Sequence, residues 1–274
     1  MSYFIFGGSG FIGTHLIALI DNLYPGTKIY NLDIVENNHE GKSTYINCDV
    51  RSEINIDIPV TSEDVIFNFA AVHRTPGHPD QAYFETNIRG AENVCAFAEK
   101  FGIKKIVFTS SIAPYGAAED LKTEETLPTP NTPYGISKLV AEKIHTIWQA
   151  KKLNERQLTI VRPGVVFGKG ENGNFTRLYW GIRGGKFFYP GRKDTIKACI
   201  YVKELVRFML YRLENHSEGV ELYNCTFESA FTIEQIVETM KKATGLQRTI
   251  VKVPGSLLMT VASIVGPLGG KALG

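Results

Sequence analysis

The segment Gly7-Gly8-Ser9-Gly10-Phe11-Ile12-Gly13 decides the fold of this 274-residue chain. It follows the apolar run Tyr3–Phe6, which is typical of a buried strand, and opens the helical pattern Phe11–Leu23. The glycines permit a tight turn (Gly7), close approach of the backbone to a pyrophosphate (Gly10) and close packing of the helix (Gly13). The helix N-terminus would then face the phosphate charge. The segment therefore predicts a dinucleotide-binding loop formed by Gly7, Gly10, Phe11, Ile12 and Gly13.

An aspartate follows this loop at an informative distance. Asp33 lies 20 residues after Gly13 and ends the next apolar run, Lys28–Asp33. A carboxylate at this place can bind both hydroxyls of an adenosine ribose, and it would repel a 2′-phosphate. The cofactor that these residues predict is NAD rather than NADP. Asp49 and Val50, after the third expected strand, could face the adenine, or they could be ordinary turn residues.

Strand-like and helical segments alternate along the rest of the chain. The expected strands are Tyr3–Phe6, Lys28–Asp33, Thr44–Cys48, Val65–Ala70, Lys105–Thr109 and Leu158–Arg162, and the expected helices are Phe11–Leu23, Gln81–Phe101 and Tyr134–Lys152. This alternation predicts an α/β fold with a doubly wound parallel sheet. Because the pattern loosens after Gly168, we expect a nucleotide-binding domain over 1–168 and a smaller α/β substrate-binding part over 169–274.

Composition and charge exclude several classes of protein. Hydrophobic residues make up 43% and charged residues 21% of the chain, which is typical of a globular protein. The net charge of +2 is too small for a dedicated nucleic-acid binder. Residues 1–150 hold 11 basic and 18 acidic side chains, whereas residues 151–274 hold 19 and 10. This asymmetry favours an anionic partner on the C-terminal side, with scattered solvated charges as the alternative.

The cysteines and the apolar segments bear on cellular location. Four cysteines stand apart without the spacing of a metal site or a disulfide framework, so we expect no metal and a reducing, cytoplasmic compartment. The first residues lack the basic region of a signal peptide. The apolar run Leu257–Leu268 is shorter than the ~20 residues that span a bilayer. The sequence therefore favours a protein without membrane contact, with a peripheral contact as the alternative.

Tyr134 and Lys138 form a candidate acid–base pair. Four residues apart on a helix, they share one face, and Thr132 with Pro133 is a good start for that helix. A nearby ammonium can lower the pKa of a phenol from ~10 toward neutrality, and such a phenol is a general base or acid. Ser110 and Ser111 follow the strand Lys105–Thr109, at the sheet edge where ligands bind in such folds.

These motifs, taken together, resemble those of the extended short-chain dehydrogenase/reductase family, in its NAD-dependent epimerase/dehydratase group. The resemblance runs from Ser2 to about Lys242. It rests on GGSGFIG (7–13), Asp33, FNFAAVH (67–73), NIRG (87–90), TSSIAPYG (109–116), PYGISK (133–138), RPGVVFG (162–168) and IYVKELV (200–206). The implied fold is a Rossmann domain.

The resemblance also implies roles for individual residues. The catalytic residues would be Tyr134 as base and acid, Lys138 at the nicotinamide ribose, and Ser111 as the hydroxyl partner. The cofactor would further contact Ala70, Ala71, Asn87, Thr109, Pro163 and Val166. The substrate would contact His73, Ser111, Asn174 and Lys197. Members of the family often pair through the helices that bear Asn87 and Tyr134, which implies a homodimer.

Departures from the family pattern separate its branches. The acids that 4,6-dehydratases need are replaced by Ser110-Ser111-Ile112, so dehydration is not expected. The basic segment 169–203 favours a nucleotide-diphosphate sugar as substrate, handled by an epimerase or a 4-keto reductase. The apolar C-terminal run keeps a dehydrogenase of an apolar alcohol, such as a hydroxysteroid, as the alternative. Because family members commonly run longer, an abbreviated or truncated C-terminal part is also expected.

Overall fold

The computed structural model describes residues 1–36, 41–73, 77–217, 219–229, 231–254 and 256, so the apolar run Leu257–Leu268 lies outside the described residues. In chain order the elements are β1 (Tyr3–Phe6), α1 (Phe11–Leu23), β2 (Ile29–Asp33), β3 (Thr44–Asn47), β4 (Val65–Asn68), α2 (Asp80–Tyr83), η1 (Phe84–Ile88), α3 (Arg89–Phe101), β5 (Lys105–Thr109), η2 (Ala113–Tyr115), α4 (Pro133–Ala150), β6 (Gln157–Pro163), β7 (Val165–Phe167), α5 (Asn174–Arg183), β8 (Tyr189–Pro190), β9 (Cys199–Tyr201), α6 (Val202–Glu214), β10 (Val220–Cys225), α7 (Ile233–Thr244) and β11 (Lys252–Val253).

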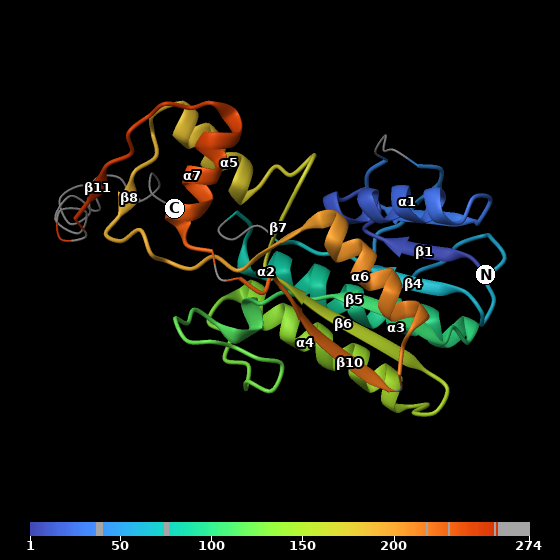
Figure 1. The fold of residues 1–274 in the computed structure, drawn as a ribbon. Coiled ribbons are helices and arrows are strands. Elements are labelled where there is room, and N and C mark those ends of the chain that lie inside the picture. The colour runs from blue at the N-terminus through green and yellow to red at the C-terminus, as the bar shows by residue number, and fades with distance from the viewer. Residues whose placement is uncertain (37–40, 74–76, 218, 230, 255, 257–274) are drawn as a thin grey trace. The chain divides into compact units, whose positions relative to one another are not determined.

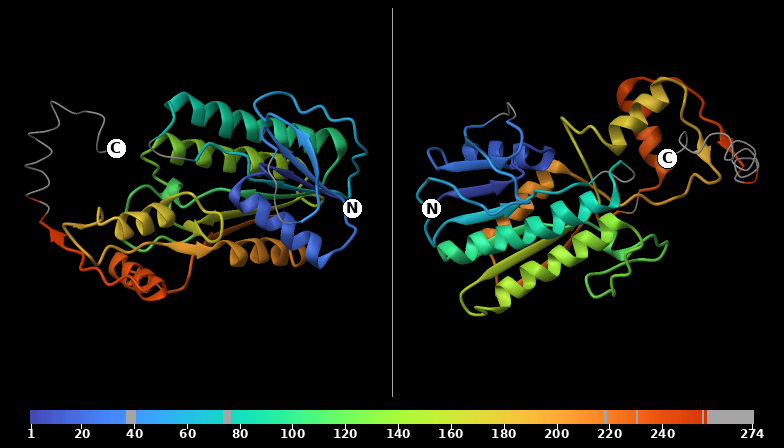
Figure 2. Two further views of the ribbon diagram at one scale, coloured as in Figure 1. Left: turned by 90° about the horizontal axis from the view of Figure 1, so that it is seen from above. Right: turned by 180° about the vertical axis from the view of Figure 1, so that it is seen from behind.

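A seven-stranded parallel sheet organises the larger part of the chain. Its strand order is β10-β6-β5-β4-β1-β2-β3, and every neighbouring pair is parallel. Helices α1 and α6 lie on one face, and α3 and α4 lie on the other (Figure 1 and Figure 2). The prediction of a doubly wound α/β fold is confirmed.

Alternating side chains of the strands build one hydrophobic core on each face of the sheet. On β1, Phe4 and Phe6 pack in the cluster that includes α3 and α4, whereas Tyr3 and Ile5 pack in the cluster that includes α1 and α6. Buried on both faces, β1 is apolar throughout, as expected of a central parallel strand.

The strand order reverses between β1 and β4, and all seven strands end at the same edge of the sheet. A crevice forms at such a switch point, because the loops that follow the two strands turn to opposite faces. The glycine loop follows β1, and the segment with Ala70 and Ala71 follows β4. The topology thus places the candidate cofactor residues at the ligand-binding edge.

The chain forms two compact units, and the first is not continuous in sequence. It comprises Met1–Gly168 together with Ile200–Thr226, and the second comprises Lys169–Cys199 together with the chain from Phe227 onward. The expected division at 168 thus misses the return of 200–226, where β10 pairs with β6 and extends the sheet. In the second unit, Ile182, Tyr189 and Val237 form a small core of its own.

The helix predicted over Gln81–Phe101 is interrupted. The structure has α2, then a π-helical turn (η1), then α3. A π turn inserts an extra residue into the helical repeat and therefore rotates the side chains around it. Asn87 lies in this turn, and only 3% of its surface is exposed.

Candidate active site

The glycine loop has the conformation that its sequence requires. Gly7 has a φ of +76°, and a Cβ at this residue would lie 2.7 Å from the backbone nitrogen of Ala70. A Cβ at Gly13 would lie 2.6 Å from Cα of Gly8, so Gly13 lets α1 pack directly on the loop. Gly8, which the sequence analysis passed over, is also required, because a Cβ there would overlap the side-chain oxygen of Asn31.

The N-terminus of α1 leaves its first amide groups free of side-chain capping. Gly10 is the N-cap residue and supplies no side-chain hydrogen bond. Among the described residues outside its own helix and chain neighbours, a Cβ at Gly10 would meet the carbonyl oxygen of Gly7, at 3.2 Å, and no other atom within 4 Å. Uncapped amides and the helix dipole together suit a pyrophosphate.

Asp33 lies beside this loop, as predicted. Its carboxylate accepts hydrogen bonds from the backbone nitrogens of Ser9 (3.0 Å) and Val35 (3.2 Å). Asp49 is instead engaged by Arg51, whose Nε lies 2.9 Å and whose Nη2 lies 2.6 Å from its carboxylate oxygens. These bonds with Arg51 outweigh burial and lower the pKa of Asp49.

Val50 serves packing at the position where the sequence suggested an adenine contact. It is buried, and a Cβ on Gly90 would lie 2.8 Å from its Cγ2. Its carbonyl accepts a hydrogen bond of 2.7 Å from the side chain of Asn93. The side chain of Val50 therefore fixes α3 against the loop after β3.

Asn87 ties two predicted parts of the site together. Its side chain accepts from the nitrogen of Val72 (2.8 Å) and donates to the carbonyl of Val72 (3.1 Å). It also donates to the hydroxyl of Ser137 (2.8 Å), which in turn donates to the carbonyl of Tyr134 (2.8 Å). The segment after β4, which carries Ala70 and Ala71, is thereby fixed to the helix of the acid–base pair.

Ser111, Tyr134 and Lys138 converge at the end of β5. Thr132 caps α4 by accepting from the nitrogen of Gly135 at 3.1 Å, which confirms the predicted start of this helix. The hydroxyls of Tyr134 and Ser111 share a hydrogen bond. The Lys138 ammonium donates to the carbonyl of Thr109 at 2.6 Å and lies 4.7 Å from the ring centre of Phe108.

The electrostatics of the pair differ from the prediction. Burial raises the pKa of the Tyr134 phenol, which outweighs the opposite effect of its hydrogen bond with Ser111. Burial also lowers the pKa of Lys138 from 10.5 to about 7, against the charge of Glu142, which raises it. The prediction that the ammonium brings the phenol below its usual pKa is therefore wrong for the chain by itself, because desolvation dominates both groups.

Ser110, the other serine of the candidate segment, has a different partner. Its hydroxyl donates to the Glu142 carboxylate at 2.5 Å, and its side chain is buried. The structure therefore separates the two serines: Ser111 faces Tyr134, and Ser110 belongs to a buried polar cluster. The pattern of the sequence did not predict that cluster, although Glu142 stands one helical turn after Lys138.

The remaining residues that the sequence assigned to the site have few contacts that indicate a role in binding. Pro163 ends β6 and is buried, and Val166 lies in β7. His73 is exposed. In the second unit, Asn174 begins α5 and accepts from Arg177 at 2.8 Å, whereas Lys197 is exposed and its backbone nitrogen donates to Phe231.

The described residues fit a dinucleotide. The uncapped end of α1 suits the pyrophosphate, and Asp33 lies beside it at the end of β2. At the other end of the crevice, the hydroxyl of Thr109 is buried without a hydrogen-bond partner among the described residues. An unpaired buried hydroxyl is costly unless a ligand supplies the partner.

Within the described ranges, no group of three or more His, Cys, Asp and Glu side chains could hold a metal ion. No helix in the same ranges is long and apolar enough to cross a bilayer.

Comparison with known proteins identifies relatives of the whole arrangement. The model of the NAD dependent epimerase/dehydratase family matches residues 3–226. The N-acetyl-alpha-D-glucosaminyl-diphospho-ditrans,octacis-undecaprenol 4-epimerase of Escherichia coli O157:H7 is 35% identical over 87% of this chain and 71% of its own length. The UDP-glucose 4-epimerase of Bacillus subtilis is 27% identical over 89% of this chain and 83% of its own length.

A solved structure shares the fold. MoeE5 in complex with UDP-glucuronic acid and NAD superimposes with a TM-score of 0.79 at 23% identity, over 93% of this chain and 86% of that one.

Proposed function

Because the chain belongs to the NAD-dependent epimerase/dehydratase family, we propose that it inverts the 4-position of a sugar carried on a nucleotide diphosphate, using NAD. One observation carries the proposal. Ser111, Tyr134 and Lys138 meet at the carboxyl end of β5, at the same edge of the sheet as the glycine loop that follows β1. Both curated relatives described above are named as 4-epimerases.

NAD, when bound, supplies a hydride acceptor and donor for the carbinol carbon. The Tyr134 oxygen takes the proton of the sugar hydroxyl during oxidation. It returns the proton after the keto sugar has rotated to present its other face. Ser111, hydrogen-bonded to Tyr134, orients that hydroxyl. Lys138 would hold the nicotinamide ribose, and its positive charge would act against the burial that raises the pKa of Tyr134.

Further residues would hold the two ligands. NAD would contact the glycine loop (Gly7, Gly10, Phe11, Ile12, Gly13), Asp33, Asp49, Ala70, Ala71, Thr109, Pro163 and Val166. Because Asn87 and Val50 are occupied with packing and backbone hydrogen bonds, they would act on the cofactor through the segments that they fix. His73, Asn174 and Lys197 would contact the substrate.

A panel of sugars tests this function. The purified chain with NAD is given UDP-glucose, UDP-N-acetylglucosamine or UDP-glucuronic acid, and the 4-epimers are followed by proton NMR. We expect interconversion of at least one pair, lost in Tyr134→Phe. Failure of all three, with turnover of a hydroxysteroid instead, would replace the proposal by the apolar-alcohol alternative.

The carrier of the sugar is a separate question, because the E. coli relative is named for a sugar on a polyprenyl diphosphate. Both carriers present a diphosphate to the basic segment 169–203, so charge alone does not separate them. The panel therefore includes N-acetylglucosaminyl-diphospho-undecaprenol, with and without vesicles. Turnover of this compound alone would keep the reaction and replace the nucleotide carrier, and it would also overturn the expectation of no membrane contact.

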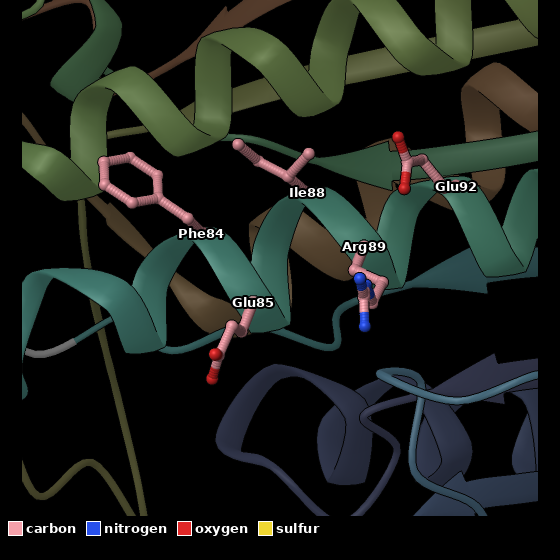
Figure 3. A pocket seen from close by; sticks show the side chains of 5 residues that line it. All are labelled: Phe84, Glu85, Ile88, Arg89 and Glu92. Carbon is pink, nitrogen blue, oxygen red and sulfur yellow. The ribbon is translucent and has the colours of Figure 1, made fainter.

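A homodimer through the outer faces of α3 and α4 is the proposed assembly. Ile136 and Ile147 on α4 are 40% and 61% exposed, and Phe84 on the adjoining π turn is 36% exposed. Figure 3 shows Phe84 and Ile88 on the side of their helix toward α4, lining a shallow hollow of about 260 Å³. Light scattering should give twice the chain mass, and Ile147→Glu should give the monomer. A monomeric unmodified chain would contradict the proposal.

A reducing, cytoplasmic compartment is proposed from the thiols. Cys48, Cys95, Cys199 and Cys225 are all buried and unpaired. Burial raises the pKa of Cys48, Cys95 and Cys225, which keeps these thiols protonated and unreactive.

A further inference from the structure

A buried carboxylate, Glu142, stands one helical turn after Lys138 and belongs to none of the roles described so far. Only 3% of its surface is exposed. One oxygen, Oε1, accepts from the Ser110 hydroxyl (2.5 Å) and from Nε of Arg162 (2.8 Å), and Oε2 accepts from Nη2 of Arg162 (2.6 Å). The bidentate pair with Arg162 is itself buried. A buried carboxylate so fully bonded is held in one geometry.

The cluster continues across the sheet to β10. Nη1 of Arg162 donates to the hydroxyl of Tyr115 (2.8 Å), over whose ring the guanidinium lies at 4.8 Å. The Tyr115 hydroxyl donates to the side-chain oxygen of Asn224 (2.9 Å). The backbone nitrogen of Asn224 donates to Glu124 (2.6 Å), in the long loop between η2 and α4. Polar groups of α4, β6, η2 and β10 are thereby joined in one chain of bonds.

This chain of bonds holds residues before and after Ser111 in the sequence. Ser110, the residue before it, is bound by Glu142, and Tyr115, four residues after it, is bound by Arg162. Between them, the Ser111 hydroxyl accepts from the nitrogen of Ala113 at 3.1 Å. The peptide that carries Ser111 is thus fixed by the Glu142–Arg162 pair.

We propose that Glu142 is a positioning residue for the reaction: its carboxylate fixes the peptide of Ser111 through Ser110 and Arg162, and it places a negative charge one helical turn from Lys138. The inference rests on the proposed function for its catalytic consequence. Its effect on Lys138 concerns NAD binding and does not depend on which sugar is used.

The charged and titratable groups around Lys138 support the electrostatic part. Tyr134, Glu142 and His145 share α4 with it, Tyr83 of α2 packs on Tyr134 with ring centres 6.2 Å apart, and Arg162 comes from β6. Burial lowers the pKa of His145 to about 4, so this imidazole is neutral near pH 7. Glu142 is the charge that raises the pKa of Lys138 against desolvation. Its removal should deprotonate Lys138 at a lower pH.

The experiment measures NAD affinity against pH by calorimetry, from pH 6 to pH 9, without substrate. In the unmodified chain we expect affinity to fall as Lys138 loses its proton. In Glu142→Gln the midpoint of this fall should move down by about one pH unit, as removal of a nearby opposite charge predicts. Glu142→Asp keeps the charge and should keep the midpoint.

A matched control separates this effect from simple destabilisation. Glu221 is also buried, pairs with Arg212 and accepts from a serine hydroxyl, that of Ser217 (2.7 Å), but it stands at the start of β10. Glu221→Gln should leave the midpoint unchanged. If Glu142→Gln does not fold, the double variant Glu142→Gln/Arg162→Met, which leaves no unpaired buried charge, takes its place and should show the same shift.

Activity gives the second readout. With the sugar that the panel identifies, Glu142→Gln should lower kcat at least tenfold with KM within about threefold, whereas Glu221→Gln should change neither. An unshifted midpoint in Glu142→Gln, or an equal shift in Glu221→Gln, overturns the inference. A chain that binds NAD with the predicted midpoints but converts no sugar contradicts the proposed function and leaves the electrostatic role of Glu142 standing.

Discussion

Each end of the seven-stranded sheet holds a glutamate–arginine pair, fully buried at the carboxyl end and partly buried at the amino end, and the pairs differ in what surrounds them. At the carboxyl end, Glu142 and Arg162 lie next to Lys138 and the peptide of Ser111. At the amino end, Glu221 and Arg212 join β10 to α6. Both glutamates bind an arginine and a serine hydroxyl, so the pairs differ chiefly in their position on the sheet, and only the pair at the carboxyl end adjoins the proposed catalytic residues.

Stability alone does not account for pairs of this kind. Desolvation of two charges offsets much of their attraction, so a buried pair is weak evidence for a stabilising role. The pair at the carboxyl end has neighbours that give it a further role, a lysine whose pKa burial lowers and a serine that hydrogen-bonds the candidate base.

The largest expected effect comes from the acid–base group at the carboxyl end. Tyr134→Phe removes only the hydroxyl, so we expect turnover to fall by about 10²–10⁴, the usual contribution of general acid–base catalysis. The melting temperature should change little. Steady-state kinetics and a thermal melt measure both, and wild-type activity in this variant would show that the base lies elsewhere.

The variant Lys138→Met separates the effect of Lys138 on turnover from its effect on stability, at the carboxyl end of the sheet. Because the pKa of Lys138 in the folded chain is about 7 instead of 10.5, the folded chain binds fewer protons than the unfolded chain between these values. Stability therefore rises with pH across that window, and the ammonium opposes folding at neutral pH.

Replacement by Met should thus abolish turnover and raise the melting temperature at pH 7. A single lost hydrogen bond, worth ~1 kcal/mol, does not outweigh the relief of desolvation. Differential scanning calorimetry at pH 7 measures the effect, and a lower melting temperature would show that the ammonium is not strained by burial.

The two pairs should respond alike in stability. Removal of one partner of a buried pair leaves an uncompensated charge and costs ~3–5 kcal/mol, so Glu142→Gln and Glu221→Gln should show similar losses in urea denaturation. Only the first should move the pH dependence of NAD binding. A large loss of stability in only one of these variants would show that the two pairs do not contribute alike to folding.

Acid should weaken the pair at the amino end of the sheet. Although burial acts in the opposite sense, the bonds with Arg212 and Ser217 hold the pKa of Glu221 at about 2, below its ordinary 4.5. This pair therefore contributes stability above pH 4.5, about 3 kcal/mol by linkage, which is lost as pH falls toward 2. In Glu221→Gln, the decline of stability between pH 4.5 and pH 2 should be shallower than in the unmodified chain, and an equally steep decline would assign it to other groups.

The smallest expected effect concerns helix capping. Thr132 caps α4, which carries Tyr134, and Thr232 caps α7 in the second unit through a capping box with Gln235. Replacement of either by Ala should cost ~1 kcal/mol of stability. Thr132→Ala should also lower kcat, since it loosens the first turn of α4, whereas an equal kinetic effect of Thr232→Ala would point to a global cause.

Local patterns made much of the fold predictable. The bounds of α1 and β5 agree with the predicted ones, because glycines, caps and apolar runs act within a few residues of one another. The role of β10 was not predictable, because a six-residue strand joins the sheet through β6, about 60 residues earlier in the chain. The π turn at Phe84–Ile88 likewise depends on packing that no local pattern encodes.

In the candidate site, too, local sequence features were predictable and features that depend on distant packing were not. Ser111, Tyr134 and Lys138 were predicted from sequence order and are brought together, because strand ends in a parallel sheet share an edge. The burial that controls their pKa values was not predictable, since it depends on groups from other elements, such as Phe108 of β5 beside Lys138. For the same reason, the packing of Val50 against Gly90 of α3 was not predictable from the sequence.

The most direct test of the proposed epimerisation follows a deuterium label at C4 of the sugar. The sugar nucleotide that the panel identifies is labelled with deuterium at C4 and incubated with the enzyme and NAD in ordinary water. Reversible hydride transfer to NAD predicts that the 4-epimer forms with its deuterium retained at C4 and that NADH does not accumulate. Loss of the label to water, or NADH formed in proportion to consumed sugar, would contradict epimerisation by reversible hydride transfer at this site.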